Sequence, residues 1–105
     1  MMLDQGTLDD IVQRIVEVAR PEKIILFGSA ARDDMGPHSD VDLLTIKQGV
    51  DLRRLTAKIY RRLHGVGAAV DAIMVTPKDV ERYKNSHALI IKPARREGRV
   101  VYESA

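Results

Sequence analysis

The sequence contains no cysteine and no tryptophan, and it has a single phenylalanine among its 105 residues. The absence of cysteine excludes disulfides, zinc sites built from thiolates and cysteine nucleophiles. Aromatic residues make up only 4% of the chain, so it is poorly supplied for stacking the bases of single-stranded nucleic acid. Lys and Arg number 17 against 15 Asp and Glu, and this net charge of +2 does not indicate nucleic-acid binding. We therefore expect no nucleic-acid partner.

Long apolar runs and a leader pattern are also missing. No apolar run approaches the roughly 18 residues of a membrane span. The opening stretch, MMLDQGTLDD, has acids where a signal peptide has a basic segment followed by an apolar one. We expect a cytoplasmic protein without a membrane partner. The composition, 45% apolar and 30% charged, is typical of a globular chain, and the length fits one small domain over residues 1–105.

Helical and extended patterns alternate along the chain. Apolar residues at helical spacing from Leu8 to Ala19 predict a first helix, which Thr7 is placed to cap. Asp9 and Asp10 suit the positive end of its dipole. Short apolar or β-branched runs predict strands over Lys23–Phe27, Asp40–Ile46, Ala69–Val75 and Arg99–Tyr102. Further helices are predicted over Asp51–Leu63, from the tetrad Thr76-Pro77-Lys78-Asp79, and over Ser86–Glu97. The alternation predicts an α/β domain.

Three aspartates form the most informative pattern. Residues two apart in a strand point to the same face and lie roughly 6.5 to 7 Å apart, so Asp40 and Asp42 present two carboxylates side by side. Such a pair repels unless a cation is present, and a hard divalent ion prefers oxygen ligands. Asp71 lies in an otherwise apolar strand, where an unpaired buried carboxylate would be costly. A metal site shared by all three explains them together, and three carboxylates can hold two ions roughly 3.5 to 4 Å apart for displacement at phosphorus.

A Gly28-Ser29 pair follows the first predicted strand. Glycine lets the backbone approach a phosphate closely, where N–H groups and the serine hydroxyl can donate to its oxygens. A helical turn at residues 30–32 would add a favourable dipole. Alone, Gly-Ser is an ordinary turn, Asp-x-Asp a solvated strand edge and Asp71 an ion-pair partner for an arginine. Their combination predicts nucleotidyl transfer, in which a hydroxyl attacks the α-phosphorus of a nucleoside triphosphate and pyrophosphate leaves.

The segment FGSAARDDMGPHSDVDLLTI resembles the signature of the polymerase-β-like nucleotidyltransferase superfamily. The Ala-Arg after Gly-Ser, the serine before Asp-x-Asp and the short length are most similar to the minimal nucleotidyltransferases. The resemblance implies a small fold with a mixed sheet of about four strands flanked by helices. It further implies a triphosphate held at Gly28 and Ser29, with Arg32 and Ser39 as further nucleotide-binding candidates, metals bound by Asp40 and Asp42, and Asp71 completing the site and activating the acceptor.

The resemblance also implies cofactors and a partner. Two Mg²⁺ ions are expected, with Mn²⁺ as an alternative, and ATP as the nucleotide donor. Similar small chains are often encoded beside a helical HEPN-domain toxin, so the implied role is that of an antitoxin that modifies a tyrosine hydroxyl of the toxin. Asp33 stands where many relatives have glycine, and its charge would weaken nucleotide binding if it faced the triphosphate. Arg32 has two readings, a charge near the phosphates or a partner for a carboxylate.

Other functions and assemblies remain open from the sequence. The chain could neutralise a toxin by binding alone, as a non-catalytic antitoxin or scaffold module. It could instead transfer nucleotides to RNA ends or to a small molecule such as an aminoglycoside. A homodimer is as compatible with the sequence as a complex with a toxin. Basic residues of the second predicted helix are expected to face solvent, and the three tyrosines, Tyr60, Tyr83 and Tyr102, are expected to be packing positions.

Overall fold

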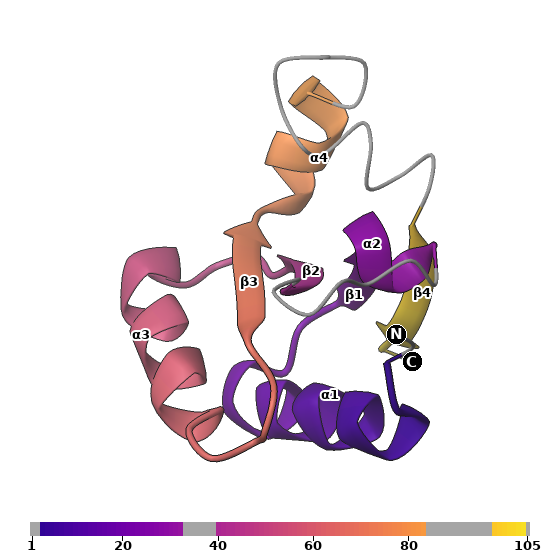
Figure 1. Ribbon diagram of the computed structural model, residues 1–105. Coiled ribbons are helices and arrows are strands. Elements are labelled where there is room, and N and C mark those ends of the chain that lie inside the picture. Colours follow the sequence, from indigo (N-terminus) through magenta and orange to yellow (C-terminus); the bar gives the residue numbers. More distant parts are fainter. Residues whose placement is uncertain (1–2, 33–39, 84–97, 105) are drawn as a thin grey trace.

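The computed structural model of the protein describes residues 3–32, 40–83 and 98–104. Its helices and strands alternate along the chain (Figure 1), in the order α1 (Gln5–Ala19), β1 (Lys23–Phe27), α2 (Gly28–Ala31), β2 (Val41–Ile46), α3 (Leu52–Arg62), β3 (Val70–Val75), α4 (Pro77–Tyr83) and β4 (Arg99–Glu103). All four predicted strands are confirmed to within one residue at each end. The helix predicted over Ser86–Glu97 lies outside the described residues.

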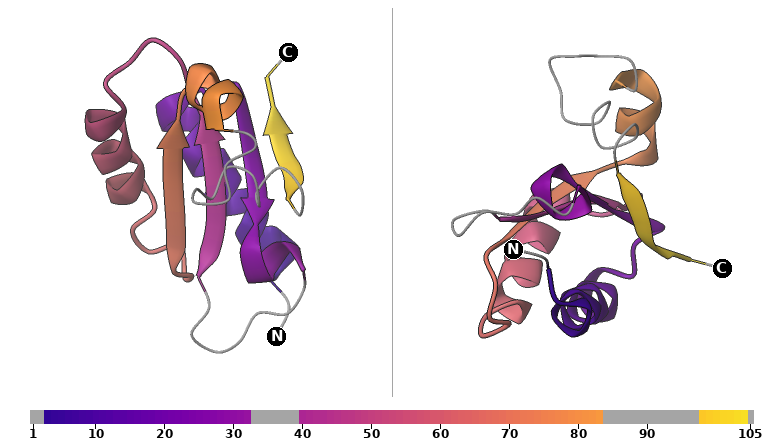
Figure 2. Two further views of the ribbon diagram at one scale, coloured as in Figure 1. Left: turned by 90° about the horizontal axis from the view of Figure 1, so that it is seen from above. Right: turned by 45° about the vertical axis from the view of Figure 1, so that its right-hand side comes forward.

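The four strands form one mixed sheet in the order β3-β2-β1-β4. Strand β1 is antiparallel to both β2 and β4, whereas β2 and β3 are parallel. Parallel neighbours require a crossover connection, and α3 provides it between β2 and β3. The left view of Figure 2 shows the strands side by side, with α3 next to β3. The predicted α/β class and the mixed four-stranded sheet flanked by helices are confirmed.

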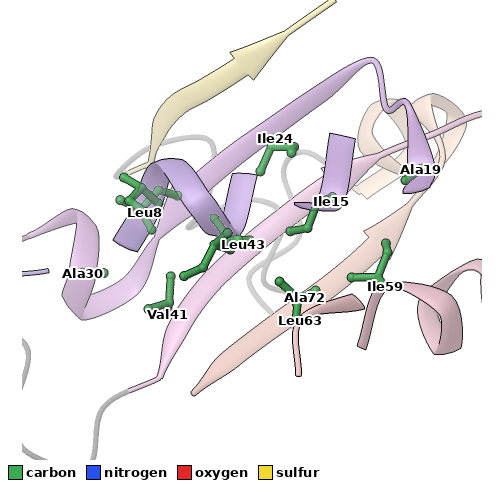
Figure 3. Packing of buried hydrophobic residues seen from close by; sticks show 12 residues of the cluster. Leu8, Ile15, Ala19, Ile24, Ala30, Val41, Leu43, Ile59, Leu63 and Ala72 are labelled. Carbon is green, nitrogen blue, oxygen red and sulfur yellow. The ribbon is translucent and has the colours of Figure 1, made fainter. Parts of the chain in front are cut away.

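The larger part of the core lies between the sheet and helices α1 and α3 (Figure 3). Ile11, Ile15 and Ile59 of the two helices are fully buried there against the sheet. Alternate residues of a strand face opposite sides, so Val41 and Leu43 point into this core. The residues of β2 that alternate with them point to the other face of the sheet. A smaller cluster on that face contains Ile25, Phe27, Leu44, Ile46 and Val75, and Val80 of α4 packs against it. Asp42 therefore belongs to the face that α1 and α3 leave open.

Acidic side chains take part in capping the N-termini of helices α1, α3 and α4. Helix α1 begins at Gln5 because Asp4 is its N-cap, with Asp4 Oδ2 accepting the Thr7 N–H at 3.0 Å. The predicted cap at Thr7 is therefore wrong, and no acid lies in the first turn of α1. At α4 the prediction is confirmed, since the Thr76 N–H donates to Asp79 Oδ2 and the Asp79 N–H to Thr76 Oγ1, both at 3.0 Å.

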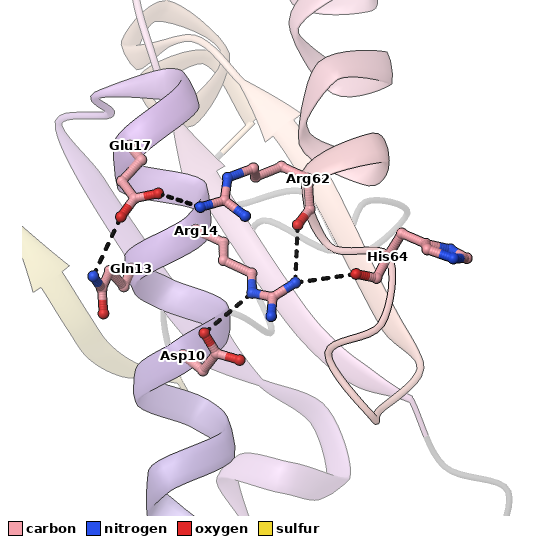
Figure 4. A network of polar contacts seen from close by, with 6 residues as sticks. All are labelled: Asp10, Gln13, Arg14, Glu17, Arg62 and His64. Atoms are coloured by element: carbon pink, nitrogen blue, oxygen red, sulfur yellow. Dashed lines mark hydrogen bonds and ion pairs between the residues drawn. The ribbon is translucent and has the colours of Figure 1, made fainter.

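A cluster of polar contacts joins α1 to the C-terminal end of α3 (Figure 4). Arg14 Nη1 donates to the carbonyl oxygens of Arg62 at 3.2 Å and of His64 at 3.1 Å, while its Nε contacts Asp10 Oδ1 at 3.1 Å. Arg62 Nη2 forms an ion pair with Glu17 Oε2 at 2.7 Å. Arg14 thus satisfies two carbonyl groups that the end of a helix leaves without intrahelical partners. The contacts fix the end of α3 against α1.

The outer surface of α3 is strongly basic. Its exposed residues include Arg53, Arg54, Lys58, Arg61 and Arg62, as the sequence predicted, and the helix contains no acid. The N-cap residue Asp51 accepts the Arg54 N–H at 3.2 Å.

Among the helices that the structure describes, none combines the length and the apolar character needed to cross a bilayer.

Among the described residues, Thr45 is the polar side chain that lies buried in the core. Its side chain is fully buried in β2, and its hydroxyl has no hydrogen-bond partner among the described residues. A buried polar group without a partner costs about 1–3 kcal/mol. Replacing Thr45 with valine, which has the same shape, is expected to raise the free energy of unfolding by roughly 1 kcal/mol, measured by urea denaturation.

Thr56→Val is the matched control, because the Thr56 hydroxyl donates to the Leu52 carbonyl oxygen at 2.7 Å. That variant loses a hydrogen bond and is expected to bring no gain in stability. A Thr45→Val protein less stable than the wild type would contradict the prediction.

Candidate active site

The candidate site lies at the end of the sheet where β1 finishes and where β2 and β3 begin (Figure 2, left). The strand register pairs Asp42 with Phe27 of β1 on one side and with Asp71 of β3 on the other. Paired residues of parallel strands point to the same face, and neighbouring strands lie about 4.8 Å apart. The structure therefore brings the side chains of Asp42 and Asp71 together, although 28 residues separate them in the sequence.

The three aspartates differ in exposure. Asp42 is half-buried, whereas Asp71 is exposed, and so is Asp40, which precedes β2 by one residue. The expectation that Asp71 is buried in an apolar strand is wrong, because β3 is an edge strand of the sheet and Asp71 is exposed. Its carboxylate therefore needs no metal to avoid a burial cost. Its position opposite Asp42, rather than its burial, makes it a candidate functional group.

The pKa of the Asp42 carboxyl is raised above its ordinary value. Partial burial is the main cause, since it disfavours the charged form, and the nearby charges of Asp71 and Asp40 raise the pKa further. Arg32 acts in the opposite direction and lowers the pKa. The site therefore concentrates negative charge around Asp42. A cation or a phosphate-bound metal at this point would relieve the repulsion.

Gly28 places its backbone directly against the Asp42 side chain. The residue has φ +72°, in the left-handed region, and a Cβ at this position would overlap Asp42 Oδ2 and lie 3.3 Å from its Cγ. Ser29 follows within the short helix α2, which Ala30 anchors by being buried. A side chain at this position would need a strained backbone and a displaced Asp42 carboxylate, so glycine allows the close approach of the backbone to the carboxylate.

Arg32 ends α2 and is exposed. Its backbone N–H donates to the Gly28 carbonyl oxygen at 3.3 Å, and its charge reaches Asp42. Both readings of Arg32 thus retain support, since it offsets a carboxylate and lies beside the Gly-Ser pair. Ser39, the remaining nucleotide-binding candidate, lies outside the described residues, as does Asp33.

Tyr60 belongs to this region, which the sequence did not indicate. Its Oη accepts the Ala72 N–H at 2.9 Å and lies 3.5 Å from Asp71 Oδ1. The residue is 40% exposed, so it is not the packing position that was expected. Tyr102, by contrast, is half-buried and packs against the larger core, as expected.

The chemistry of the donor set fits a magnesium ion bound together with a substrate. Within residues 3–32, 40–83 and 98–104, no three histidine, cysteine, aspartate or glutamate side chains are grouped so that they could hold an ion alone. Mg²⁺ commonly takes one or two carboxylates and completes its coordination with water and substrate phosphates rather than with an all-protein cage. Asp42 and Asp71 supply such a carboxylate pair. The charges of Asp71 and Asp40, which add to the effect of partial burial in raising the pKa of Asp42, are what a cation would offset.

The chain also has a groove away from the aspartates. It lies between α1 and β4, has a volume of about 570 Å³ and is lined by apolar residues such as Leu8, Val12 and Val101. None of the candidate site residues lines it. Size alone does not decide function here, because the groove lining is mainly apolar, with Asp9, Glu17 and Arg99 as its charged residues, while the aspartate site combines clustered carboxylates with a close backbone approach.

The four-stranded mixed sheet with its Gly-Ser and Asp-x-Asp arrangement matches the pattern expected of a nucleotidyltransferase. The family profile of polymerase beta nucleotidyltransferases matches residues 9–105, and the chain therefore belongs to that family. A comparison with curated proteins by sequence gave no match.

Two solved structures share the fold. One is a chain of the toxin–antitoxin pair MntA–HpeT, crystallised with two aspartates two residues apart changed to glutamate; it has TM-score 0.65 and 10% identity, over 97% of this chain and 75% of that one. The other is a protein described as a nucleotidyltransferase from Sulfolobus solfataricus, with TM-score 0.53 and 19% identity, over 98% of this chain and 92% of that one.

Proposed function

We propose that this protein transfers a nucleoside monophosphate, with ATP as donor, to a hydroxyl group, and that the acceptor is a tyrosine of a HEPN-domain toxin that it neutralises. One observation carries the proposal: Asp42 and Asp71 lie on paired positions of adjacent strands, with the backbone of Gly28 against the Asp42 carboxylate. Family membership supports the reaction class.

On the donor side, Gly28 and Ser29 are proposed to hold the triphosphate. The hydroxyl of Ser29 makes no hydrogen bond within the described part of the chain, so it can donate to a phosphate oxygen. Asp40 and Asp42, with Asp71, are proposed to hold Mg²⁺ together with the oxygens of the triphosphate, and the ion would then offset the charge of the carboxylates and of the triphosphate. Arg32 adds a further positive charge at the same end of the sheet.

On the acceptor side, Asp71 is proposed to take the proton from the attacking hydroxyl. The acceptor oxygen then forms a bond to the α-phosphorus, the bond from that phosphorus to the bridging oxygen breaks, and pyrophosphate leaves. Asp71 suits this role because it is exposed at the edge of the sheet, where an acceptor on another protein can reach it. The structural likeness to a chain of a toxin–antitoxin pair supports a protein partner.

Nucleotide transfer is tested directly by mass spectrometry. The protein is incubated with Mg²⁺, each of the four nucleoside triphosphates in turn, and the protein encoded by the adjacent reading frame. We expect one nucleoside monophosphate to be added to a tyrosine of the partner with ATP, and no addition with the Asp42→Ala variant. Gly49→Ala is a control, since Gly49 lies in an open loop with space for a Cβ.

The outcomes separate the alternatives. RNA ends and an aminoglycoside are offered in parallel incubations. If one of them receives the nucleotide and the partner protein does not, that molecule is the acceptor and the proposed tyrosine acceptor is wrong. An unmodified partner that is still neutralised by Asp42→Ala would show that binding, not transfer, is the function, and would refute the proposal.

A further inference from the structure

The side chain of Tyr60, from helix α3, contacts the edge of the sheet beside Asp71. Strand β3 has a neighbour only on its β2 side, so the backbone groups of its outer edge have no strand partner among the described residues. Tyr60 extends from α3 to this edge, and its Oη accepts the Ala72 N–H at 2.9 Å. This bond fixes the position of the tyrosine oxygen next to Asp71.

The single proton of the Tyr60 hydroxyl has two acceptors within reach. Oη lies 3.5 Å from Asp71 Oδ1 and 3.5 Å from the Ala72 carbonyl oxygen. A charged carboxylate is the stronger acceptor, which favours donation to Asp71. The distance is long for an O–H···O bond, and contacts of this kind commonly shorten when the substrate is bound.

Asp71 needs an orienting group more than a buried residue does. It is exposed, so packing leaves its side chain several rotamers, and it faces the like charge of Asp42 across the strand pair. Within the described residues, Tyr60 is the side chain that reaches Asp71 with a hydrogen-bond donor. A carboxylate held through Oδ1 keeps its second oxygen for another partner.

We propose that Tyr60 is a positioning residue for Asp71, which orients the carboxylate that accepts the proton of the acceptor hydroxyl. The role rests on the proposed transfer reaction. Helix α3, which carries Tyr60, is held firmly in place. Its residue Ile59, the neighbour of Tyr60, is buried in the core, and Arg14 binds the end of the helix. Tyr60 is thereby presented to β3 from a fixed helix rather than from a loop.

The test compares Tyr60→Phe with wild type in steady-state transfer of AMP from ATP to the partner protein. Misplacing a catalytic group by about 1 Å can cost 10²-fold in rate, and the loss of one orienting bond is expected to lower kcat about tenfold. The KM for ATP is expected to stay within about twofold, because Tyr60 contacts the acceptor side of the site and the donor side is unchanged. Tyr102→Phe is the matched control, since Tyr102 lies on β4 at the far edge of the sheet.

A purely structural role for Tyr60 predicts a different result. Loss of the hydroxyl would then speed hydrogen exchange of the Ala72 amide and lower the melting temperature, while kcat per folded molecule stayed at the wild-type value. That outcome would overturn the proposal, as would a nucleotide attached to Tyr60 itself, which would make it an acceptor. Failure of the wild-type protein to modify any acceptor would instead refute the proposed function. This outcome differs from failure of the Tyr60 proposal alone, in which the wild-type protein transfers the nucleotide and Tyr60→Phe transfers it equally fast.

Discussion

Replacing Asp42 with asparagine is expected to abolish nucleotide transfer and, at neutral pH, to make the protein more stable. Under the proposed function this change removes a carboxylate proposed to hold Mg²⁺, and such a loss is worth several kcal/mol of transition-state stabilisation, or about 10³-fold in rate. The gain in stability comes from removing a half-buried charge that faces Asp71, and like charges directly opposite one another cost up to about 1 kcal/mol. The same residue thus lowers stability and enables the reaction.

The pH dependence of this gain follows from the raised pKa of Asp42. A carboxyl whose pKa is higher in the folded state binds its proton more tightly there, so protonation favours folding. The stability it contributes is fully present below the ordinary pKa of about 4 and is lost as the pH rises through the folded-state pKa. Asp42→Asn has no such loss, and its advantage over wild type is expected to grow with pH above about 4 and then to level off.

Thermal unfolding followed by circular dichroism between pH 4 and 8 measures this difference. Glu22→Gln is the control, since it removes one negative charge from an exposed position just before β1, at the opposite end of that strand from Gly28. Addition of Mg²⁺ with ATP is expected to raise the melting temperature of the wild type but not of Asp42→Asn, because only a ligand that binds the folded state stabilises it. A variant less stable than wild type at pH 7 would contradict the prediction.

Replacing Gly28 with alanine is the second change with a large expected effect. At φ +72° a non-glycine residue is strained by about 1–3 kcal/mol, and its Cβ would overlap the Asp42 carboxylate. Because the carboxylate is the freer of the two groups, it is expected to move, and transfer activity is expected to fall by roughly 10²-fold. A circular dichroism melt and the transfer assay together measure both effects.

Gly49→Ala separates strain from displacement. Gly49 has φ +81°, a comparable strain, but a Cβ there meets nothing within 4 Å. This variant is expected to lose a similar amount of stability while keeping its activity. Equal activity in Gly28→Ala and Gly49→Ala would show that the contact with Asp42 does not matter for the reaction.

Much of the fold could be predicted from local sequence. Runs such as residues 23–27 and 41–46 are mostly β-branched or apolar and are bounded by glycine or polar residues, and each forms a strand. The start of α1 was misplaced because Asp4 and Thr7 are both good caps, and the apolar stripe that begins at Leu8 favoured the later one. The choice depends on one hydrogen bond that composition does not reveal.

The site was predictable only in part. The spacing of Gly28-Ser29 and Asp40-x-Asp42 is a local pattern, and the structure places Gly28 and Asp42 together at one end of the sheet. The order of the strands is a non-local property, so the sequence could not show that Asp71 lies on an outer strand. The contact of Tyr60 with Asp71 depends on how α3 packs beside that strand, and no sequence pattern marked it.

The residues of the candidate site come from two parts of the chain, one before and one after the loop that leads from β2 into α3. Gln48, Gly49 and Val50 form an exposed stretch within this loop, and exposed loop tips are where chains best tolerate a break. A break there would leave Gly28 and Asp42 on one fragment and Tyr60 and Asp71 on the other. Nucleotide transfer would then depend on the two fragments meeting, which makes this loop a natural place to divide the protein into a split reporter of protein association.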